Sequence, residues 1–415
     1  MGFIEKPLRS VHSNFAFENY KTREMKRNST SRRNFLQKTT LAGAGITLAE
    51  PLQMFGQSNG QTGNSKNIKS KGIAGMDTYS PLELWDFERR PVGETDVLVE
   101  IKYSSICHSD IHTIRGHWGK QPFPQVAGHE ITGIVKAIGN KVTKFKVGDR
   151  VGVGVIADTC MKCNPCKEGQ EQHCVEGMIG TYGAPYPAEP TKITQGGYAN
   201  NIVTKEHFVF KIPDSLKLEH AAPLLCAGIT VYSPIMRHQV KKGDKVGVVG
   251  IGGLGHLAVK LAVSRGAEVY AFTTSPSKVE DIKRFEAKEV IVVDKSDKLK
   301  PYFGKLDYMV CTVPYDFPVS DYISCVKPYG FFTQVGVGEN GGITLNNFNM
   351  VNNSVNYNGS LVGGTIETQE LLNYCAANKI YPEVQIIKAN EVNDAWDKVV
   401  NKEARYRYVI DASTI

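Results

Sequence analysis

Four cysteines lie close together in the chain, at a spacing that suits a metal ion. Cys160, Cys163 and Cys166 are followed by Cys174 after seven intervening residues. Zn²⁺ prefers thiolate ligands in a tetrahedral arrangement, and four such ligands leave no position open to a substrate. Disulfides are the alternative, but disulfide scaffolds are short and cysteine-dense, whereas this chain has 9 cysteines in 415 residues. We therefore predict a structural zinc lobe at residues 160–174.

A glycine-rich loop predicts a second site, one for a dinucleotide. Its residues are Gly250, Ile251, Gly252, Gly253, Leu254 and Gly255. The loop follows an apolar strand pattern and leads into an apolar helical pattern, which is the context that such a loop requires. Gly250 would permit the tight turn, Gly252 would let the backbone approach a pyrophosphate, and Gly255 would allow close packing of helix on strand. The N–H groups at the start of the helix, around Gly253 and Leu254, would bind the phosphates.

The end of the next strand pattern indicates which dinucleotide binds. NAD-binding proteins place an Asp or Glu there to accept the ribose 2′-OH, and that carboxylate would repel a 2′-phosphate. In this chain the corresponding residues are Thr273, Thr274, Ser275 and Lys278. They offer hydroxyl groups and one cation, so we predict NADP(H) rather than NAD(H). The alternative is that these residues only cap the helix that follows.

Three further motifs lie far apart in the sequence. They are Cys107-His108-Ser109-Asp110-Ile111-His112, Gly128-His129-Glu130 and Leu224-Leu225-Cys226-Ala227-Gly228. With the cysteine lobe and the glycine loop, in this order, the chain resembles the zinc-dependent alcohol dehydrogenases of the medium-chain dehydrogenase/reductase superfamily, and most of all their cinnamyl alcohol dehydrogenase branch. The resemblance covers roughly residues 71–415.

The resemblance implies a catalytic zinc held by Cys107, His129 and Cys226, with a fourth position left for water or a substrate oxygen. Glu130 would approach the metal when that ligand leaves, or else act only as a neighbouring carboxylate. Asp110 would orient the ligand imidazole. Taken singly, either cysteine is better explained as a buried thiol, so the assignment depends on the whole set.

The resemblance also implies a reaction. Zinc would act as a Lewis acid on the substrate oxygen while hydride passes between the substrate carbon and the nicotinamide. Ser109 would take the hydroxyl proton and pass it through the cofactor ribose to His112, whose pKa suits exchange near neutral pH. His117 and Trp118 are candidates for the pocket wall or for ordinary packing. The predicted function is an NADP(H)-dependent alcohol dehydrogenase or aldehyde reductase with broad primary alcohol and aldehyde substrates.

Two other functions fit the same fold. One is a zinc-free enone or quinone reductase of the same superfamily, which the intact zinc ligand set argues against. The other is a nucleotide-binding protein without turnover, which the presence of Ser109 and His112 disfavours although the fold alone does not exclude it. The resemblance further implies a homodimer that pairs through the cofactor domain.

The patterns between the motifs predict the elements that position these residues. Segments 97–101 and 131–135 alternate apolar and polar residues, which indicates antiparallel strands. From about Lys245 onward, short apolar strands alternate with helical segments, which is typical of right-handed βαβ units and a parallel sheet. The strands of this part are expected at 246–249, 268–273 and 290–293, and the helices at 254–264 and 277–285.

These patterns predict an α/β protein of two domains. The resemblance gives the domains their types. They are a β-rich GroES-like catalytic domain at 71–226, a doubly wound Rossmann domain that binds NADP at 227–356, and a C-terminal return to the catalytic domain at 357–415. Residues 1–70 would form a leader and a flexible linker.

The charge of the chain is unevenly placed. The formal net charge is +7, and residues 1–70 alone hold eleven Lys and Arg against four acidic residues. The rest of the chain is therefore balanced, which argues against a nucleic-acid partner. No apolar run approaches the roughly 20 residues of a membrane span.

The first 70 residues resemble a twin-arginine export signal. The motif is Ser31-Arg32-Arg33-Asn34-Phe35-Leu36-Gln37, followed by an apolar stretch at 39–49 and a polar linker at 51–70. We predict recognition by the twin-arginine export machinery, removal of the leader between about Ala49 and Ser70, and a periplasmic enzyme. The alternative is a basic disordered tail on a cytoplasmic protein.

Overall fold

This computed structural model describes residues 66–339 and 342–415. The predicted leader, and the linker as far as residue 65, lie outside the described residues. Within the described ranges, no helix combines the length and the apolar character needed to cross a membrane. Strand β1 (Ile68–Gly75) begins three residues before the predicted boundary at 71, because its pairing with the following strand already starts at Ile68, opposite Arg89. The buried Ser70 also donates its Oγ hydrogen to Asn201 Oδ1 at 2.7 Å.

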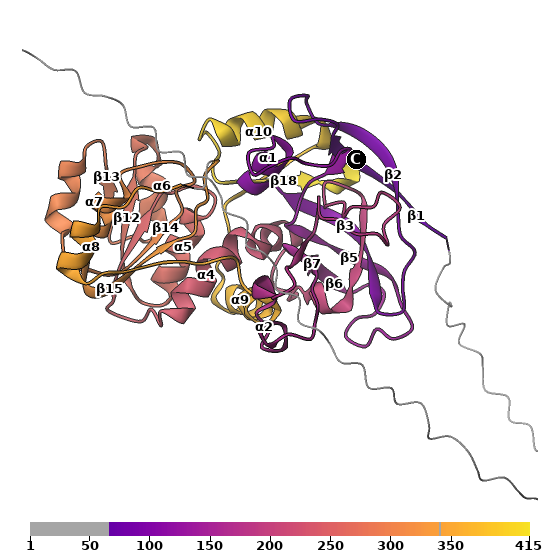
Figure 1. Ribbon diagram of the computed structural model, residues 1–415, viewed down its shortest axis with the longest axis horizontal. Helices are drawn as coiled ribbons and strands as arrows, with labels where there is room; N and C mark the ends of the chain where they lie inside the picture. The colour runs from indigo at the N-terminus through magenta and orange to yellow at the C-terminus, as the bar shows by residue number, and fades with distance from the viewer. Residues whose placement is uncertain (1–65, 340–341) are drawn as a thin grey trace, which may run out of the picture. The chain divides into compact units, whose positions relative to one another are not determined.

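The catalytic half contains a seven-stranded sheet in the order β10-β6-β5-β3-β18-β17, with β9 also paired to β3 (Figure 1). The central strand β3 pairs with β5 in antiparallel fashion, as the alternating patterns predict, and its Val97, Val99 and Ile101 are buried. The strands of this sheet are β3 (Asp96–Ser105), β5 (Ile131–Ile138), β6 (Arg150–Val153), β9 (Asn201–Lys205), β10 (Val209–Lys211), β17 (Val384–Ile387) and β18 (Arg407–Asp411).

Smaller elements complete the catalytic half. Strand β1 pairs with β2 (Glu83–Arg89) and β4 (Gln125–Val126), and β7 (Ile156–Asp158) pairs with β8 (Ile179–Gly180). The helices of this half are α1 (His108–Ile114), α2 (Asn164–Lys167), α3 (Leu218–Ala221), α9 (Thr365–Asn378) and α10 (Val392–Val400). Helix α4 (Ala227–Arg237) lies at the start of the predicted cofactor domain, and its Val231 and Tyr232 share a core cluster with Val246 and Leu257.

The cofactor half is a six-stranded parallel sheet in the order β13-β12-β11-β14-β15-β16. Its strands are β11 (Lys245–Val249), β12 (Glu268–Thr273), β13 (Glu289–Val292), β14 (Leu306–Cys311), β15 (Val326–Gln334) and β16 (Asn356–Gly359). Its helices are α5 (Gly255–Ser264), α6 (Val279–Arg284), α7 (Val319–Ile323) and α8 (Asn347–Asn353). The strand order reverses at β11, and ligands of such sheets bind at the carboxyl ends of the strands at that point.

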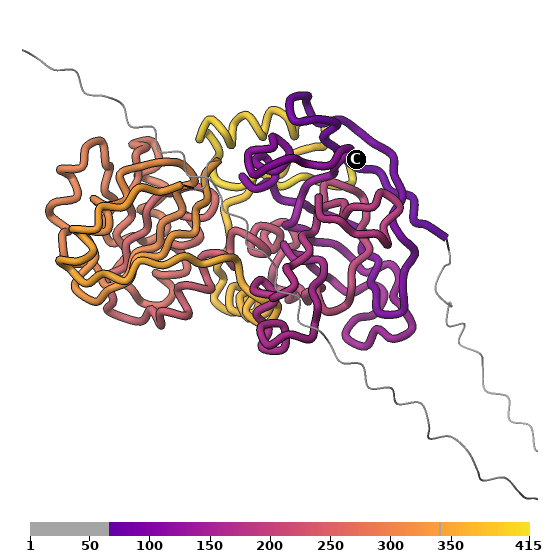
Figure 2. Tube along the Cα trace, in the orientation of Figure 1, coloured from indigo at the N-terminus to yellow at the C-terminus, as the bar shows by residue number. Residues whose placement is uncertain are grey.

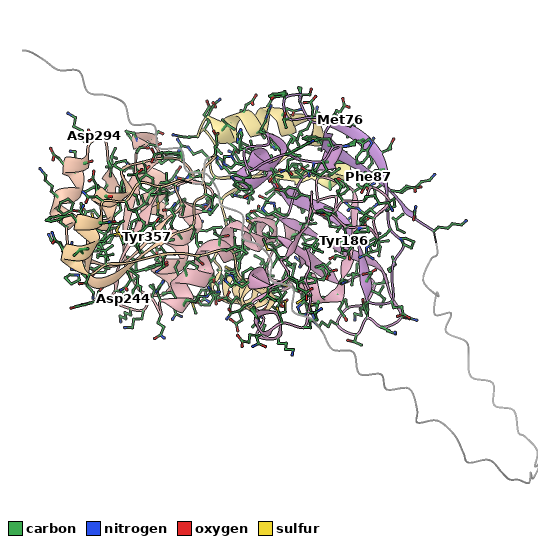
Figure 3. All side chains as sticks on the ribbon, in the orientation of Figure 1. Met76, Phe87, Tyr186, Asp244, Asp294 and Tyr357 are labelled. Atoms are coloured by element: carbon green, nitrogen blue, oxygen red, sulfur yellow. The ribbon has the colours of Figure 1, made fainter. Side chains whose placement is uncertain are left out.

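The predicted doubly wound fold is confirmed, with two local differences. The helix expected at 277–285 starts as a 3₁₀ turn, Pro276–Lys278, before α6 begins, since proline fits the first turn of a helix but donates no hydrogen bond. Strand β16 crosses the predicted boundary at 356 because it pairs with β15, with Tyr357 opposite Phe332. Side chains fill both halves, with Phe87 of β2 and Tyr357 of β16 labelled in Figure 3.

The C-terminal segment returns to the catalytic sheet. Strand β18 pairs antiparallel with β3, with Val409 opposite Ser105, and in Figure 2 the yellow C-terminal trace lies among the indigo and violet segments of the catalytic half. This pairing inserts a strand from the end of the chain between β3 and the edge strand β17. It also brings Arg407 to the segment around residues 105–130, where the chemistry-bearing motifs lie.

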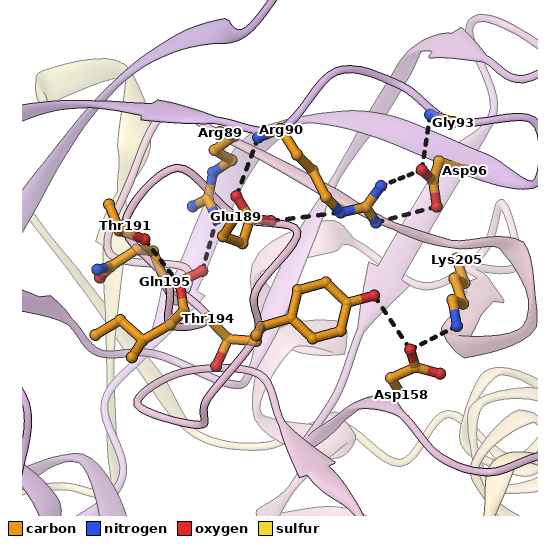
Figure 4. A network of polar contacts seen from close by, with 12 residues as sticks. Arg89, Arg90, Gly93, Asp96, Asp158, Glu189, Thr191, Thr194, Gln195 and Lys205 are labelled. Atoms are coloured by element: carbon orange, nitrogen blue, oxygen red, sulfur yellow. Dashed lines mark hydrogen bonds and ion pairs between the residues drawn. The ribbon is translucent and has the colours of Figure 1, made fainter.

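A buried polar network fixes the loop at residues 184–195 to the catalytic sheet (Figure 4). The fully buried Arg89 donates to the carbonyl oxygens of Gln195 and Gly196 at 2.6 and 2.8 Å, and burial lowers its pKa to about 10. Next to it, Arg90 pairs with both Asp96 and Glu189. Because buried charges are costly unless they are paired, this network specifies one position for the loop.

Candidate active site and metal groups

The four lobe cysteines converge as their spacing predicts. Their sulfur atoms all lie within 4.8 Å of one another, with Cys163 and Cys166 at 3.4 Å and Cys160 and Cys166 at 4.0 Å. Four thiolates around one Zn²⁺ at about 2.3 Å would be about 3.8 Å apart, so the donor set fits zinc. All nine cysteines are free, and these separations exceed the roughly 2.05 Å of a disulfide bond.

The second group gathers residues from three distant segments. Cys107 directly precedes α1, His129 and Glu130 directly precede β5, and Cys226 directly precedes α4. One ligand atom from each lies within 4.8 Å of the others, and all four residues are buried. Two thiols and one imidazole are a donor set that catalytic zinc sites use, so these residues also fit the metal.

Asp110 organises this group through both of its carboxylate oxygens. Its Oδ1 accepts from His129 Nδ1 at 2.9 Å and from the Gly128 N–H at 3.1 Å. Its Oδ2 accepts from the Cys107 N–H at 2.9 Å and from the Tyr198 hydroxyl at 2.7 Å. Because Nδ1 of His129 is held in this way, Nε2 is the ring nitrogen that would bind a metal. The predicted orienting role of Asp110 agrees with this geometry.

Glu130 is buried beside the same group and is paired with a cation. Arg407 of β18 forms an ion pair with Glu130 Oε2 and donates to Ser105 Oγ at 3.1 Å. The Ala227 N–H donates to Glu130 Oε1 at 3.2 Å. Burial raises the pKa of Glu130 to about 7, although Arg407 opposes that rise. Glu130 therefore connects the β5, α4 and β18 segments around the ligands.

The thiols of this group are electrostatically unequal. A hydrogen bond from Cys226, followed by the influence of His129, holds the pKa of Cys107 well below its usual range despite burial. The same contact with Cys107, together with burial, raises the pKa of Cys226. Ser109 Oγ lies 3.7 Å from Cys107 Sγ, so the predicted relay hydroxyl is adjacent to a ligand atom.

The glycine loop has the geometry that phosphate binding requires. Gly250 has a φ of +83°, a conformation that favours glycine, and a Cβ on Gly255 would lie 1.9 Å from the Gly250 carbonyl oxygen. A Cβ on Gly252 would meet nothing within 4 Å, so the backbone there faces open space. These three positions correspond to the predicted tight turn, close packing and pyrophosphate approach.

The residues predicted to recognise the 2′-phosphate also come together. Thr273, Thr274, Ser275 and Lys278 all line the same cavity. Lys278 is buried, its Nζ donates to the Ile251 carbonyl oxygen at 3.1 Å, and burial lowers its pKa to about 8. Arg405 donates to Ser277 Oγ at 2.9 Å, while its buried Nη1 has no partner among the described residues. The buried amine of Lys278 in the lining of the cavity fits an anionic ligand, whereas Arg405 does not line the cavity.

A single cavity of about 1310 Å³ connects these features. Its lining includes the loop residues Gly250, Gly252, Gly253 and Leu254, and the predicted relay residue His112. The four residues of the buried ligand group do not line it, but their neighbours Ile106, His108 and Arg407 do. The cavity therefore extends from the nucleotide loop to the edge of the ligand group.

Comparison with known proteins decides the family. Residues 93–214 match the alcohol dehydrogenase GroES-like domain, and residues 253–377 match the zinc-binding dehydrogenase family. NADP-dependent alcohol dehydrogenase C 1 of Mycolicibacterium smegmatis is 42% identical over 343 residues, which are 82% of this chain and 97% of that protein. The chain belongs to the zinc-dependent alcohol dehydrogenases.

Further relatives agree with this membership of the medium-chain superfamily and its cinnamyl alcohol dehydrogenase-like branch. Aldehyde reductase YahK of Escherichia coli is 41% identical over 84% of this chain and 99% of that protein. The structure of CAD from Helicobacter pylori complexed with NADP(H) is 39% identical, with a TM-score of 0.79 over 84% of this chain and 99% of that one. The family, the fold class and the NADP-dependent oxidoreductase class predicted from the sequence are confirmed.

For this zinc-dependent alcohol dehydrogenase, sequence reasoning missed some residues that support the site. Arg407 pairs with Glu130, and Tyr198 donates to Asp110. No spacing rule connects either residue to its partner, because 277 residues separate Arg407 from Glu130 and 88 separate Tyr198 from Asp110. Gly255 and Ser109 do not line the cavity, since Gly255 packs against Gly250 and Ser109 faces Cys107.

Proposed function

We propose that this chain transfers hydride between NADP(H) and a primary alcohol or aldehyde, at the group formed by Cys107, His129 and Cys226. The observation that carries the proposal is the placement of this buried ligand group next to a cavity that also reaches the nucleotide loop, with Ile106, His108 and Arg407 between the group and the cavity. When bound, Zn²⁺ would supply Lewis-acid polarisation of the substrate oxygen and NADP(H) would supply the hydride.

The chain's own residues would hold and orient these groups. Asp110 fixes the imidazole of His129, and the Arg407 to Glu130 pair keeps a carboxylate next to the ligands without leaving its charge unpaired. Ser109 Oγ would accept the hydroxyl proton of the substrate, since it lies beside Cys107 and the metal ligands. His112, on the cavity wall, would exchange that proton with the surroundings.

At the other end of the cavity, Lys278 and the hydroxyl groups of Thr273, Thr274 and Ser275 would bind the 2′-phosphate of NADP(H). The buried position of Lys278 supports this role, because a buried amine is stabilised when an anion pairs with it. Gly250, Gly252, Gly253, Leu254 and Gly255 would form the pyrophosphate cradle.

We also propose a second, structural Zn²⁺ at Cys160, Cys163, Cys166 and Cys174. The enzyme would then hold two zinc ions per chain, one closed to substrate and one open. Metal analysis of the purified protein tests this count, and one zinc or none in active enzyme would contradict it.

A panel of primary aldehydes, assayed by oxidation of NADPH, tests the function. Turnover that is lost on removal of zinc and is greater with aldehydes than with enones supports the proposal. Turnover of enones or quinones that persists without zinc would indicate a zinc-free reductase, and nucleotide binding without turnover would indicate a non-catalytic protein.

We further propose export through a twin-arginine leader and assembly as a homodimer. The leader rests on Arg32, Arg33 and the apolar stretch that follows, and it suits a pathway for folded, metal-loaded proteins. Fractionation of cells that carry the native gene or an Arg32→Lys, Arg33→Lys version tests export, because uncleaved protein in the cytoplasm in both cases would contradict it. Sedimentation of the purified protein tests the dimer.

A further inference from the structure

The cavity holds a pair of histidines of which only one has a role in the reaction described above. His112 of α1 and His117, just beyond the end of α1, have their Nδ1 atoms 2.9 Å apart. Both line the cavity together with Glu339, whose Oε1 lies 3.6 Å from His117 Nδ1. From the sequence, His117 is expected only as a pocket wall or as a packing residue.

The contact between the two imidazoles connects the buried ring of His112 with the exposed ring of His117. In such a contact, one Nδ1 carries hydrogen and the other accepts it. His112 has an exposed fraction of 7%, and its buried Nε2 has no partner among the described residues. His117 is exposed. An imidazole that takes up a proton at one nitrogen can release a proton from the other, so the pair connects the cavity interior with solvent.

We propose that His117 is the outer residue of a two-imidazole proton relay, which carries the reaction's proton between His112 and solvent. Glu339 stabilises the protonated form of His117. The inference rests on the proposed function, in which His112 exchanges the proton that leaves the substrate. The proposed function assigns a role only to His112. The inference adds His117 and a route by which the proton reaches solvent.

The proton balance of the relay is simple. During alcohol oxidation, one proton enters at His112 Nε2, and the Nδ1 hydrogen of His112 moves to Nδ1 of His117. His117 then releases one proton to water, and both rings are neutral again. Aldehyde reduction runs the same steps in reverse. Between turnovers, water that enters the open cavity restores the starting tautomers by proton exchange.

The charges around the pair favour movement of the proton outward. Burial, and then the charge of His117, lower the pKa of His112, so the inner ring does not retain a proton. Glu339 draws the positive charge toward His117, at the solvent end of the pair. The other titratable or charged groups that face the pair are His108, Arg115 and the thiol of Cys107.

Trp118 fixes the position of the loop that carries Glu339 relative to the histidine pair. Its Nε1 donates to the carbonyl oxygen of Gly338 at 3.1 Å, and its ring lies 5.1 Å from that of His112. This bond joins the segment after α1 to the loop after β15, which carries Glu339. Trp118 is therefore a positioning residue that keeps Glu339 beside His117.

The test measures hydride and proton separately in the full-length, zinc-loaded enzyme. In a single turnover of NADP⁺ and a primary alcohol, absorbance follows NADPH and a pH indicator follows the released proton. We expect His117→Ala to slow proton release about a hundredfold, at the lower end of the range for a lost acid–base group. Triethanolamine buffer should restore most of the rate, with no effect on the unaltered enzyme. Triethanolamine is preferred to imidazole because imidazole nitrogen is itself a zinc ligand.

Two further variants complete the design. Glu339→Gln should slow proton release less than His117→Ala does, since it removes only the stabilising charge. His220→Ala is the matched control, because His220 is a partly exposed histidine of the catalytic half that does not line the cavity. Its proton release should equal that of the unaltered enzyme. Thermal unfolding of each variant checks that the fold is intact.

The outcomes separate this inference from the proposed function. If His117→Ala releases its proton at the unaltered rate, or slows without recovery in buffer, the relay is wrong. If His112→Ala responds to buffer while His117→Ala does not, the role of His112 stands and only the extension fails. If neither variant responds, the proposed role of His112 fails and the extension fails with it.

Discussion

The two candidate metal-ligand groups of this chain have similar donor atoms in contrasting surroundings. The lobe draws its four thiols from a single loop, and two of them, Cys160 and Cys163, are partly exposed. The other group draws its ligands from three segments between residues 107 and 226, and all of them are buried. A closed set of four thiols can only hold structure, whereas a set that leaves one position free beside a cavity can act on a substrate.

The electrostatics of the thiols follow the same contrast. In the lobe, the Val175 backbone N–H and other local donors lower the pKa of Cys163 to about 6, while burial raises that of Cys166 to about 12. In the buried group, distant residues set the balance, since Cys226 and His129 together lower the pKa of Cys107. The pKa values of the lobe thiols are therefore set by residues in or next to the lobe, whereas those of the buried group depend on residues from distant parts of the fold.

The largest expected effect is on stability, from Cys163→Ser. A closed zinc site contributes free energy to folding, on the order of 10 kcal/mol in small zinc peptides, so loss of one ligand should destabilise the lobe and lower the melting temperature by many degrees. Calorimetry and zinc analysis should show unfolding at lower temperature with one zinc lost. If the variant melts at the same temperature as the unaltered enzyme, the four lobe cysteines do not form a structural zinc site.

Cys107→Ser should show the opposite pattern. Loss of this ligand removes several kcal/mol of transition-state stabilisation, so kcat/KM should fall by about a thousandfold or more. The melting temperature should change far less than in Cys163→Ser, because the lobe is untouched. Steady-state kinetics and calorimetry on the same preparation measure both effects. Full activity in this variant would show that the buried group is not the reaction centre.

Glu171→Gln examines how the lobe is attached to the body. Burial alone would raise the pKa of Glu171, but hydrogen bonds from His207 and Thr365 lower it to about 2. A lowered folded-state pKa adds stability above the unfolded value of 4.5, and that stability is lost as pH falls from 4.5 towards 2. We expect a loss of about 1–3 kcal/mol at pH 7 that shrinks below pH 4.

Denaturant unfolding of Glu171→Gln between pH 7 and pH 3 measures this loss. The exposed Glu168→Gln is the matched control, and it should be neutral at every pH. An equal loss at pH 7 and pH 3 would show that the carboxylate charge does not attach the lobe.

The smallest expected effect is on cofactor choice, from Thr273→Asp. A carboxylate at this position would accept the ribose 2′-OH and repel the 2′-phosphate, so preference should move from NADPH towards NADH by about tenfold or more in kcat/KM. Zinc content and melting temperature should not change, because Thr273 ends β12 of the cofactor half and belongs to neither candidate metal group. Equal efficiency with both cofactors in the unaltered enzyme would contradict the prediction of NADP(H).

Much of the fold could be predicted because its signals are local. The strands β11 and β12 and the helix α5 begin and end within about one residue of the expected positions. Each has an apolar pattern with a single period and is bounded by glycine or by polar residues. The prediction of where α6 starts was less accurate, because Pro276 favours a 3₁₀ turn where the helical pattern predicts an α-helix.

The sequence by itself determined the lobe and the nucleotide loop, because their chemistry lies within residues close along the chain. Only the tertiary structure decided how Arg407 reaches Glu130, how Tyr198 reaches Asp110, and how Glu339 reaches His117. These partners are separated by 277, 88 and 222 residues. Such contacts follow from strand pairing and loop position, which no residue spacing encodes, because a contact between distant residues forms only when the intervening chain packs into one arrangement.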